Sequence, residues 1–169
     1  VEPLESDVGF DATGADDVKF LISANAGEAL GRISKIASGG ELSRIMLAMK
    51  TVFSKNDPIE TMVFDELDTG VSGIAAQRVG EKMSDLSHGK QVLCITHLPQ
   101  IAAIADNHDL IEKTERNGRT YTEVRELDRK GRALELARMH GGDNISELTL
   151  ASAEEQLLAA DKYRLTRNN

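Results

Sequence analysis

Several residue types that mark particular classes of protein are scarce in this sequence. Tryptophan is absent and aromatic residues make up 4% of the 169 residues, so the core must be built from Leu, Ile, Val, Met and Ala. The single cysteine, Cys94, excludes a framework of internal disulfides and fits a reducing compartment. No run of 18 apolar residues occurs, so we expect no transmembrane helix and no membrane partner.

Basic residues are also in deficit. Lys and Arg number 20 against 28 Asp and Glu, which gives a net charge of -8 and argues against nucleic-acid binding by bulk charge. A local patch, or another part of a longer protein, is still able to bind nucleic acid. The sequence begins at Val1 rather than Met, and we expect it to be a piece of a longer chain. With 40% hydrophobic residues, this piece should fold.

The hydrophobic pattern predicts alternating strands and helices in the middle third of the chain. An apolar stripe and the S-x-x-E spacing of Ser38 and Glu41 predict a helix from Ser38 that ends before Pro58. The elements expected after it are a buried strand over 60–66, a helix over 72–86, a strand over 90–96 and a short helix over 99–105. This order favours a parallel sheet flanked by helices, whose ligands gather at the carboxyl ends of the strands.

The two ends of the chain give weaker signals. Before the first helix we expect an acidic segment over 1–16, a strand over 18–24 and a loop over 25–37. After the middle third, Asn117-Gly118 predicts the turn of a β-hairpin over 109–127. Two helices over 130–163, separated at Gly141-Gly142, complete the expected fold.

Ser38, Gly39, Gly40 and Glu41 open the first helix. A helix N-terminus exposes unpaired N–H groups and a partial positive charge, and two glycines let an anion approach the backbone closely. The segment therefore suits a phosphate. The alternative is a simple helix cap in which the glycines serve only a tight turn.

Further candidate residues lie where the expected strands end. Asp65 and Glu66 could divide two tasks, one holding Mg²⁺ through water and the other orienting an attacking water. The alternative is a solvated pair of acids. His97 follows the next strand and could contact a phosphate oxygen, or serve only the structure. Between them, Asp68 and Gly70 lie in a polar loop, from which Asp68 could approach a neighbouring subunit.

Taken in order, these motifs resemble the second half of an ATP-binding-cassette ATPase. Ser38–Leu42 is similar to the signature motif of that family and Met62–Glu66 to Walker B with the catalytic glutamate, while Asp68 and His97 occupy the positions of the D-loop and the switch histidine. The segments ASGGELSRIMLAMK, DELDTGVSG, ITHLPQIAAIAD and ELARMHGG resemble the RecN family, bacterial DNA-repair ATPases related to structural-maintenance-of-chromosomes (SMC) proteins. The resemblance covers roughly residues 15–160.

The resemblance implies a mechanism in which two heads enclose two ATP molecules. Asp65 would help to hold Mg²⁺, Glu66 would position water and His97 would contact the γ-phosphate, while Ser38, Gly39, Gly40 and Glu41 would act in trans on the ATP of the second head. It also implies a role in double-strand-break repair and recombination, with DNA bound through the full-length protein, and a cytoplasmic, nucleoid-associated location in bacteria.

One departure from the family pattern limits this expectation. No G-x-x-x-x-G-K-[ST] P-loop occurs, so residues 1–169 are expected to be a partial domain, the C-terminal half of a split head that lacks its P-loop half and coiled coil. We expect ATP hydrolysis from the full-length protein and none from this chain alone. Two alternatives remain at this point: the nucleotide-binding subunit of a membrane transporter, and a non-catalytic interaction domain with vestigial motifs.

Overall fold

Two parallel strands form the centre of the computed structural model, which describes residues 12, 14, 18–23, 27, 29–33 and 38–167. Strands β3 (Thr61–Phe64) and β4 (Gln91–Cys94) pair from Thr61↔Gln91 to Phe64↔Cys94, and helix α3 (Gly73–Leu86) connects them. The predicted α/β class is therefore confirmed, and the parallel part consists of these two strands. Because the strands are parallel and in register, the residues that follow Phe64 and Cys94 meet at one edge of the sheet.

The parallel pair is covered on one face. Met62 and Phe64 are buried in a core with Leu47, Leu67, Met83, Leu86 and Ile101. On the other face Val63 is 64% exposed and Leu93 is 50% exposed. The predicted burial of the strand over 60–66 therefore holds for one face of β3 and not for the other. A parallel sheet that is open on one side is unusual because helices normally cover both faces.

Helix α2 (Gly39–Phe53) begins as the sequence predicts. The N–H of Ser38 donates to Glu41 Oε2 at 2.9 Å and the N–H of Glu41 donates to Ser38 Oγ at 3.4 Å, which completes a capping box. A short 3₁₀ turn, Ser54–Asn56, follows the helix. Only Gly40 and Leu47 are buried, and the apolar residues of the predicted stripe remain largely in contact with solvent: Leu42, Met46, Met49 and Phe53 are all exposed.

The N-terminal part differs from the prediction. Strand β1 (Leu21–Ile22) is shorter than the expected strand over 18–24, and it pairs antiparallel with β2 (Gly31–Arg32). The loop prediction for 25–37 is wrong at β2, because a strand of two residues carries no hydrophobic period. Most of the predicted segment over 1–16 lies outside the described residues.

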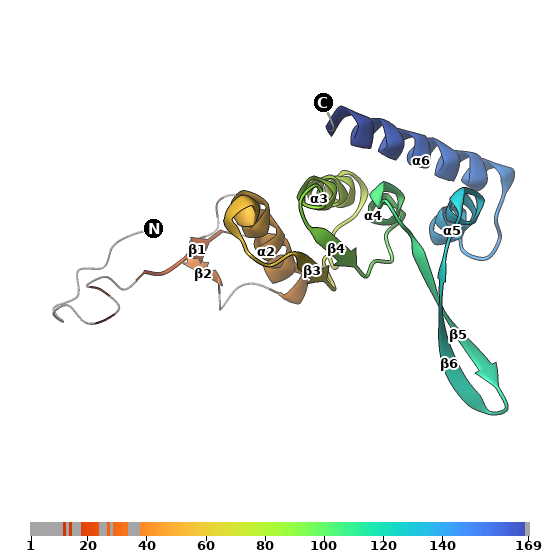
Figure 1. Ribbon diagram of the computed structural model, residues 1–169, viewed down its shortest axis with the longest axis horizontal. Helices are drawn as coiled ribbons and strands as arrows, with labels where there is room; N and C mark the ends of the chain where they lie inside the picture. Colours follow the sequence, from red (N-terminus) through yellow and green to blue (C-terminus); the bar gives the residue numbers. More distant parts are fainter. Residues whose placement is uncertain are drawn as a thin grey trace.

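The C-terminal elements agree with the prediction. Helix α4 (Pro99–Ile104) leads into the hairpin of β5 (Asp109–Arg116) and β6 (Arg119–Glu126), followed by α5 (Arg129–Gly141) and α6 (Glu147–Arg167). Asn117 and Gly118 have φ angles of 53° and 70°, as a type I′ turn requires. Figure 1 shows the hairpin projecting away from α4, α5 and α6. These three helices share a second core made of alanine and leucine: Ala102, Ala103, Ala133, Leu136, Ala137, Ala153 and Leu157.

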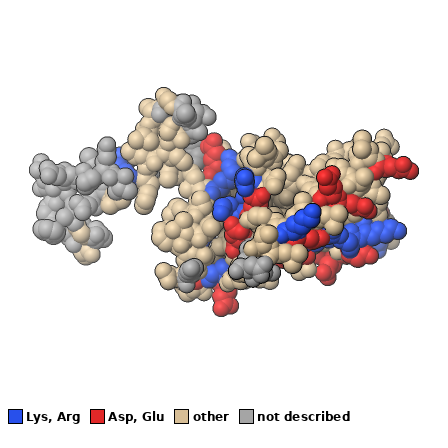
Figure 2. All heavy atoms as spheres, turned by 90° about the horizontal axis from the view of Figure 1, so that it is seen from above, with Lys and Arg blue, Asp and Glu red and all other residues tan. Residues whose placement is uncertain are grey.

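The surface carries charges of both signs. Figure 2 shows basic and acidic side chains mixed over one face of the molecule, without a broad area of basic residues alone. The lack of a broad basic area on this face agrees with the deficit of Lys and Arg in the sequence. Within the described ranges, none of the helices has the length and apolar character needed to cross a bilayer.

Candidate functional site

Gly39 and Gly40 allow helix α2 to approach the loop that follows β3. A Cβ atom on Gly40 would lie 2.9 Å from both Cβ and the carbonyl oxygen of Thr69, and 3.0 Å from the carbonyl oxygen of Glu66. On Gly39 it would lie 3.0 Å from Glu66 Oε2. The two glycines therefore have a packing role within the chain itself. Gly40 is buried, whereas Ser38 and Gly39 remain exposed at the helix N-terminus.

The acids after β3 have a constrained geometry. Asp65 Oδ1 accepts a hydrogen bond from the N–H of Glu66 at 2.9 Å. Glu66 has a φ angle of 58°, in the left-handed region that L-residues rarely adopt, and its carbonyl oxygen accepts from the N–H of Thr69 at 3.1 Å. Unfavourable backbone conformations of this kind cluster at functional sites. The turn brings the Glu66 carboxylate beside Gly39, at the positive end of the α2 dipole.

Asp68 is turned into the molecule. Its side chain is 4% exposed, and its Oδ2 accepts from Thr96 Oγ at 2.7 Å and from the N–H of His97 at 2.8 Å. The Asp68 carboxylate is therefore bound within the chain itself, and the approach of Asp68 to a neighbouring subunit stays a prediction. Burial by itself would raise the pKa of Asp68, but the hydrogen bonds from Thr96 and His97 outweigh it, so the pKa lies below its ordinary value.

His97 is oriented by the same carboxylate. Its Nδ1 lies 2.9 Å from Asp68 Oδ2, while the side chain is 74% exposed. An ionised carboxylate can only accept, so Nδ1 carries the hydrogen and Nε2 is the ring nitrogen that can meet a ligand. Such a carboxylate–imidazole pair fixes the tautomer and the direction of the ring.

Arg44 is a site residue that the sequence analysis missed. From the second turn of α2, its Nη1 donates to the carbonyl oxygens of Leu67 at 3.3 Å and Thr69 at 2.7 Å. Ser43 Oγ also reaches the carbonyl oxygen of Asp65, at 3.4 Å. Hydrogen bonds from α2 thus hold the loop. Leu67, which is 0% exposed, anchors the loop in the hydrophobic core.

The predicted site residues accordingly lie along one edge of the molecule. The N–H of Ile95 donates to the carbonyl oxygen of Phe64 at 3.0 Å, so the chain segments leading to Asp65 and His97 run side by side. Gly70, with a φ angle of 75°, allows the loop to turn back after Asp68. The fold places Glu66 beside Gly39 and Gly40, and it places Asp68 beside His97.

Cys94 lies beneath this edge. Burial raises the pKa of its thiol to about 12, and the charges of Asp68 and Asp65 add to the effect. The two carboxylates therefore create a negative local potential. In the described part of the chain, no group of three or more His, Cys, Asp and Glu residues could hold a metal ion by itself. Asp65 alone fits a hard cation such as Mg²⁺, which usually keeps several waters and binds proteins through one or two carboxylates.

Comparison with known proteins identifies relatives over nearly the whole chain. The chain is 51% identical over 153 residues to the DNA repair protein RecN of Bacillus subtilis and 50% identical over 151 residues to that of Treponema pallidum, alignments that cover 90% and 89% of this chain. It is 44% identical to RecN of Vibrio cholerae over 155 residues. The predicted resemblance to RecN is therefore confirmed. The chain spans 26–27% of the length of these relatives.

Solved structures give weaker matches. One, described as "Structural biochemistry of ATP-driven dimerization and DNA stimulated activation of SMC ATPases", superposes with a TM-score of 0.49 at 25% identity and covers 70% of this chain and 71% of that chain. Another, described as "Crystal structure of the SmcHead bound to the C-winged helix domain of ScpA", gives a TM-score of 0.49 at 26% identity over 69% of this chain and 34% of that chain. No protein-family model matches the chain.

Proposed function

We propose that residues 1–169 form part of the ATPase head of a RecN-like protein that acts in DNA double-strand-break repair and recombination. The relatives with about 50% identity are DNA repair proteins, which supports the repair role. The observation that carries the ATPase assignment is the convergence of Glu66, Asp68 and His97 at one edge of the parallel pair. In open α/β sheets this edge is where ligands bind.

Each residue at this edge has a distinct task in the proposed reaction. Glu66 orients the attacking water, and its strained backbone holds the carboxylate beside the α2 N-terminus. Asp65 would hold Mg²⁺, mostly through water, and the hydrogen bond from the Glu66 amide already orients one of its carboxylate oxygens. Because Asp68 accepts from Nδ1, His97 presents Nε2 to the γ-phosphate, and this contact requires a hydrogen on Nε2 as well, since a phosphate oxygen can only accept. When bound, ATP supplies the phosphoryl group and Mg²⁺ neutralises its charge.

The start of α2 would serve a second nucleotide. Ser38, Gly39, Gly40 and Glu41 stand at the positive end of a fifteen-residue helix, where backbone N–H groups can meet a phosphate. In the proposed assembly this segment acts in trans on the ATP of a second head, so nucleotide stabilises the paired heads. Arg44 connects α2 to the Glu66–Thr69 loop, which would couple the trans contact to the residues of the other site.

The missing half of the head has a surface on which it could dock. Val63 and Leu93 lie on the open face of the parallel pair, and Met46, Val52 and Phe53 are exposed on α2. Large apolar side chains exposed to solvent often mark an interaction site, and a parallel sheet is normally covered on both faces. We infer that the P-loop half of the same protein covers it, making 1–169 one half of a split domain that binds DNA only as part of the full-length protein.

The alternatives are not favoured. A nucleotide-binding subunit of a membrane transporter would share the signature motif and Walker B, yet the relatives are DNA repair proteins. A non-catalytic domain with vestigial motifs does not explain why Asp68 is buried in order to orient His97. Because the relatives are bacterial DNA repair proteins, we also propose that the protein works in the cytoplasm beside the nucleoid.

ATP hydrolysis by the longer protein that contains a P-loop tests this proposal. Glu66→Gln should lower kcat by at least ~100-fold, because the amide cannot orient or deprotonate the water. Glu60→Gln is the matched control: it makes the same chemical change just before the opposite end of β3 and should leave the rate unchanged. Equal rates for Glu66→Gln and the unmodified protein, with or without DNA, would rule out the assignment.

A further inference from the structure

Two arginines enclose the carboxyl end of helix α4, the helix that follows His97. Arg132, from α5, donates to the carbonyl oxygens of Ala103 at 3.1 Å, Ala105 at 2.7 Å and Asp106 at 3.1 Å. Arg164, from α6, donates to the carbonyl oxygens of Ile104 at 3.0 Å and Ala105 at 2.7 Å. The last carbonyls of a helix have no partner within it, so the hydrogen bonds to Ala103, Ile104 and Ala105 act as a cap supplied from outside, and the bond to Asp106 holds the segment that follows.

The surroundings of Arg132 also indicate that it caps α4. Arg132 is 7% exposed, and among the described residues its hydrogen bonds go to backbone carbonyls rather than to a carboxylate. Burial lowers its pKa, and the neighbouring cations Arg164 and Arg129 lower it further. A buried cation is costly unless its surroundings stabilise it, and here the negative end of the α4 dipole does so. Arg132 is therefore placed to stabilise the carboxyl end of α4.

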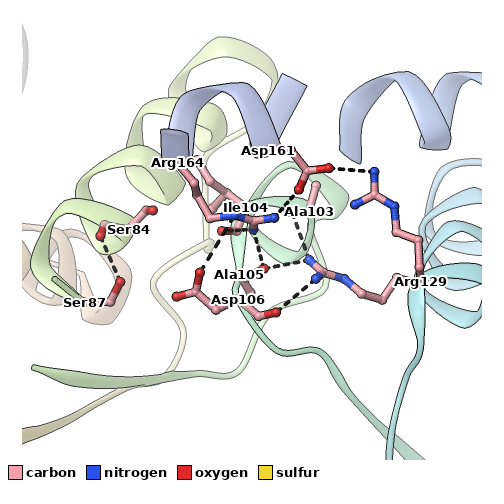
Figure 3. Close-up of polar contacts among 10 residues, drawn as sticks. Ser84, Ser87, Ala103, Ile104, Ala105, Asp106, Arg129, Asp161 and Arg164 are labelled. Atoms are coloured by element: carbon pink, nitrogen blue, oxygen red, sulfur yellow. Dashed lines mark hydrogen bonds and ion pairs between the residues drawn. The ribbon is translucent and has the colours of Figure 1, made fainter. Parts of the chain in front are cut away.

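Asp161 of α6 keeps the second arginine in place. It accepts from Arg164 on its own helix and pairs with Arg129 of α5 at 2.8 Å. Figure 3 shows Asp161 of α6 contacting both Arg129 of α5 and Arg164 of its own helix, with Arg164 reaching the segment from Ala103 to Asp106. The cap thus joins three helices at one point.

The opposite end of α4 is held by the candidate site. Thr96 Oγ donates to Asp68 and accepts from the N–H of Leu98 at 3.0 Å, and His97 binds the same carboxylate. Between its ends α4 lies close to α3: a Cβ atom on Gly80 would be 3.0 Å from Ile104 Cγ2 and 3.4 Å from the carbonyl oxygen of Gln100. These contacts link the positions of the two ends of this six-residue helix.

We propose that Arg132 and Arg164 are positioning residues for His97, acting through α4. They hold the carboxyl end of α4 so that its amino end presents Thr96 and His97 to Asp68. The catalytic consequence rests on the proposed function, in which His97 contacts the γ-phosphate. The structural part, that the two arginines maintain the His97–Asp68 contact, is independent of it.

Hydrogen exchange of the His97 amide in the 169-residue chain tests the structural part, because this N–H donates to Asp68. Arg164→Gln should accelerate exchange at His97 and Leu98 about tenfold, the effect of losing charge-assisted hydrogen bonds at the other end of α4. Arg132→Lys, which keeps the charge but not the planar fork, should give a smaller change in the same direction. Arg138→Gln is the control, since Arg138 pairs with Glu135 on its own helix.

Unchanged exchange at His97 in Arg164→Gln would overturn the proposal, and so would an equal acceleration throughout the chain. If Arg132→Lys does not fold, Arg164→Gln and Asp161→Asn still decide it. In the longer protein that hydrolyses ATP, Arg164→Gln should lower kcat about tenfold with KM for ATP changed less than about twofold. Fast exchange at His97 with an unchanged kcat would support the cap while contradicting the role of His97 in hydrolysis.

Discussion

Asp68 and His97 form the central contact of the candidate site. A single buried oxygen, Asp68 Oδ2, accepts from the backbone N–H of His97 at 2.8 Å and lies 2.9 Å from its ring Nδ1, while Thr96 supplies a third donor. One carboxylate therefore fixes both the backbone and the side chain of the histidine. Because Asp68 lies in the loop after β3 and His97 follows β4, the contact also locks the two strand ends together.

Replacing this carboxylate should destabilise the chain. Asp68→Asn removes a charged acceptor of three hydrogen bonds, and we expect a loss of about 2 kcal/mol in the free energy of unfolding at pH 7. The folded pKa of Asp68 is below its ordinary value, so its stabilising contribution is present above about pH 4 and is lost as the pH falls below that. Denaturant unfolding from pH 7 to pH 3 should therefore show a weaker acid dependence for Asp68→Asn.

Asp143→Asn serves as the control, since Asp143 is exposed between α5 and α6. It should unfold like the unmodified chain at every pH. Parallel acid profiles for the unmodified chain and Asp68→Asn would show that the buried contact contributes nothing to stability.

Local chemistry explains which parts of this structure the sequence predicts. The capping box of Ser38 and Glu41 and the turn at Asn117-Gly118 depend on residues a few positions apart, and both are present as expected. The apolar run over 61–64 predicts a strand, but it does not reveal that one face stays uncovered, since that depends on what packs there.

Contacts between distant segments account for what the sequence analysis missed. Asp68 turns inward because it accepts hydrogen bonds from Thr96 and His97. These partners lie 28 and 29 residues further along the chain, so the sequence near Asp68 gives no sign of them. Arg44 likewise finds its carbonyl partners 23 and 25 residues away. A polar residue in a loop and a cation on a helix are each typical of a solvated surface, so neither carries a local signal for these roles.

Gly40 should be intolerant of a side chain. Alanine at this position would place Cβ 2.9 Å from the backbone oxygen of Thr69 and 3.0 Å from that of Glu66, and backbone cannot move aside cheaply. We expect Gly40→Ala to lower the free energy of unfolding by about 1–3 kcal/mol. Gly89→Ala is the matched control because nothing lies within 4 Å of its added Cβ. Denaturant unfolding of both variants measures the difference, and similar midpoints would contradict the packing role.

Gly39 should behave differently from Gly40. The atom nearest to an added Cβ is Glu66 Oε2, at 3.0 Å, the far end of a flexible side chain that can swing away. Gly39→Ala should therefore change the unfolding free energy by less than about 1 kcal/mol. In the longer protein it should still reduce ATP hydrolysis, because the Glu66 carboxylate is displaced. A stable Gly39→Ala variant with full activity would show that the position of this carboxylate is unimportant.

Cys94 reports on the acids of the site. With a thiol pKa of about 12, raised by burial and then by Asp68 and Asp65, only a minute fraction is thiolate at pH 8. Alkylation by iodoacetamide should be at least ~100-fold slower in the folded chain than in denaturant. Asp68→Asn should accelerate it, because one of the two negative charges is removed. Since Cys94 is the only cysteine, the reaction is read without ambiguity. Equal rates in folded and denatured chain would contradict the raised pKa.

The 169-residue chain by itself should not hydrolyse ATP at a measurable rate. Glu66 and His97 can orient a water and touch a γ-phosphate, but the sequence contains no P-loop to cradle the β- and γ-phosphates with backbone N–H groups and a lysine. Phosphate release from ATP should match the buffer blank for both the unmodified chain and Glu66→Gln. Adding the P-loop half as a separate polypeptide should restore turnover to the unmodified chain alone. Turnover by the isolated chain that Glu66→Gln abolishes would mean that these 169 residues contain a complete site.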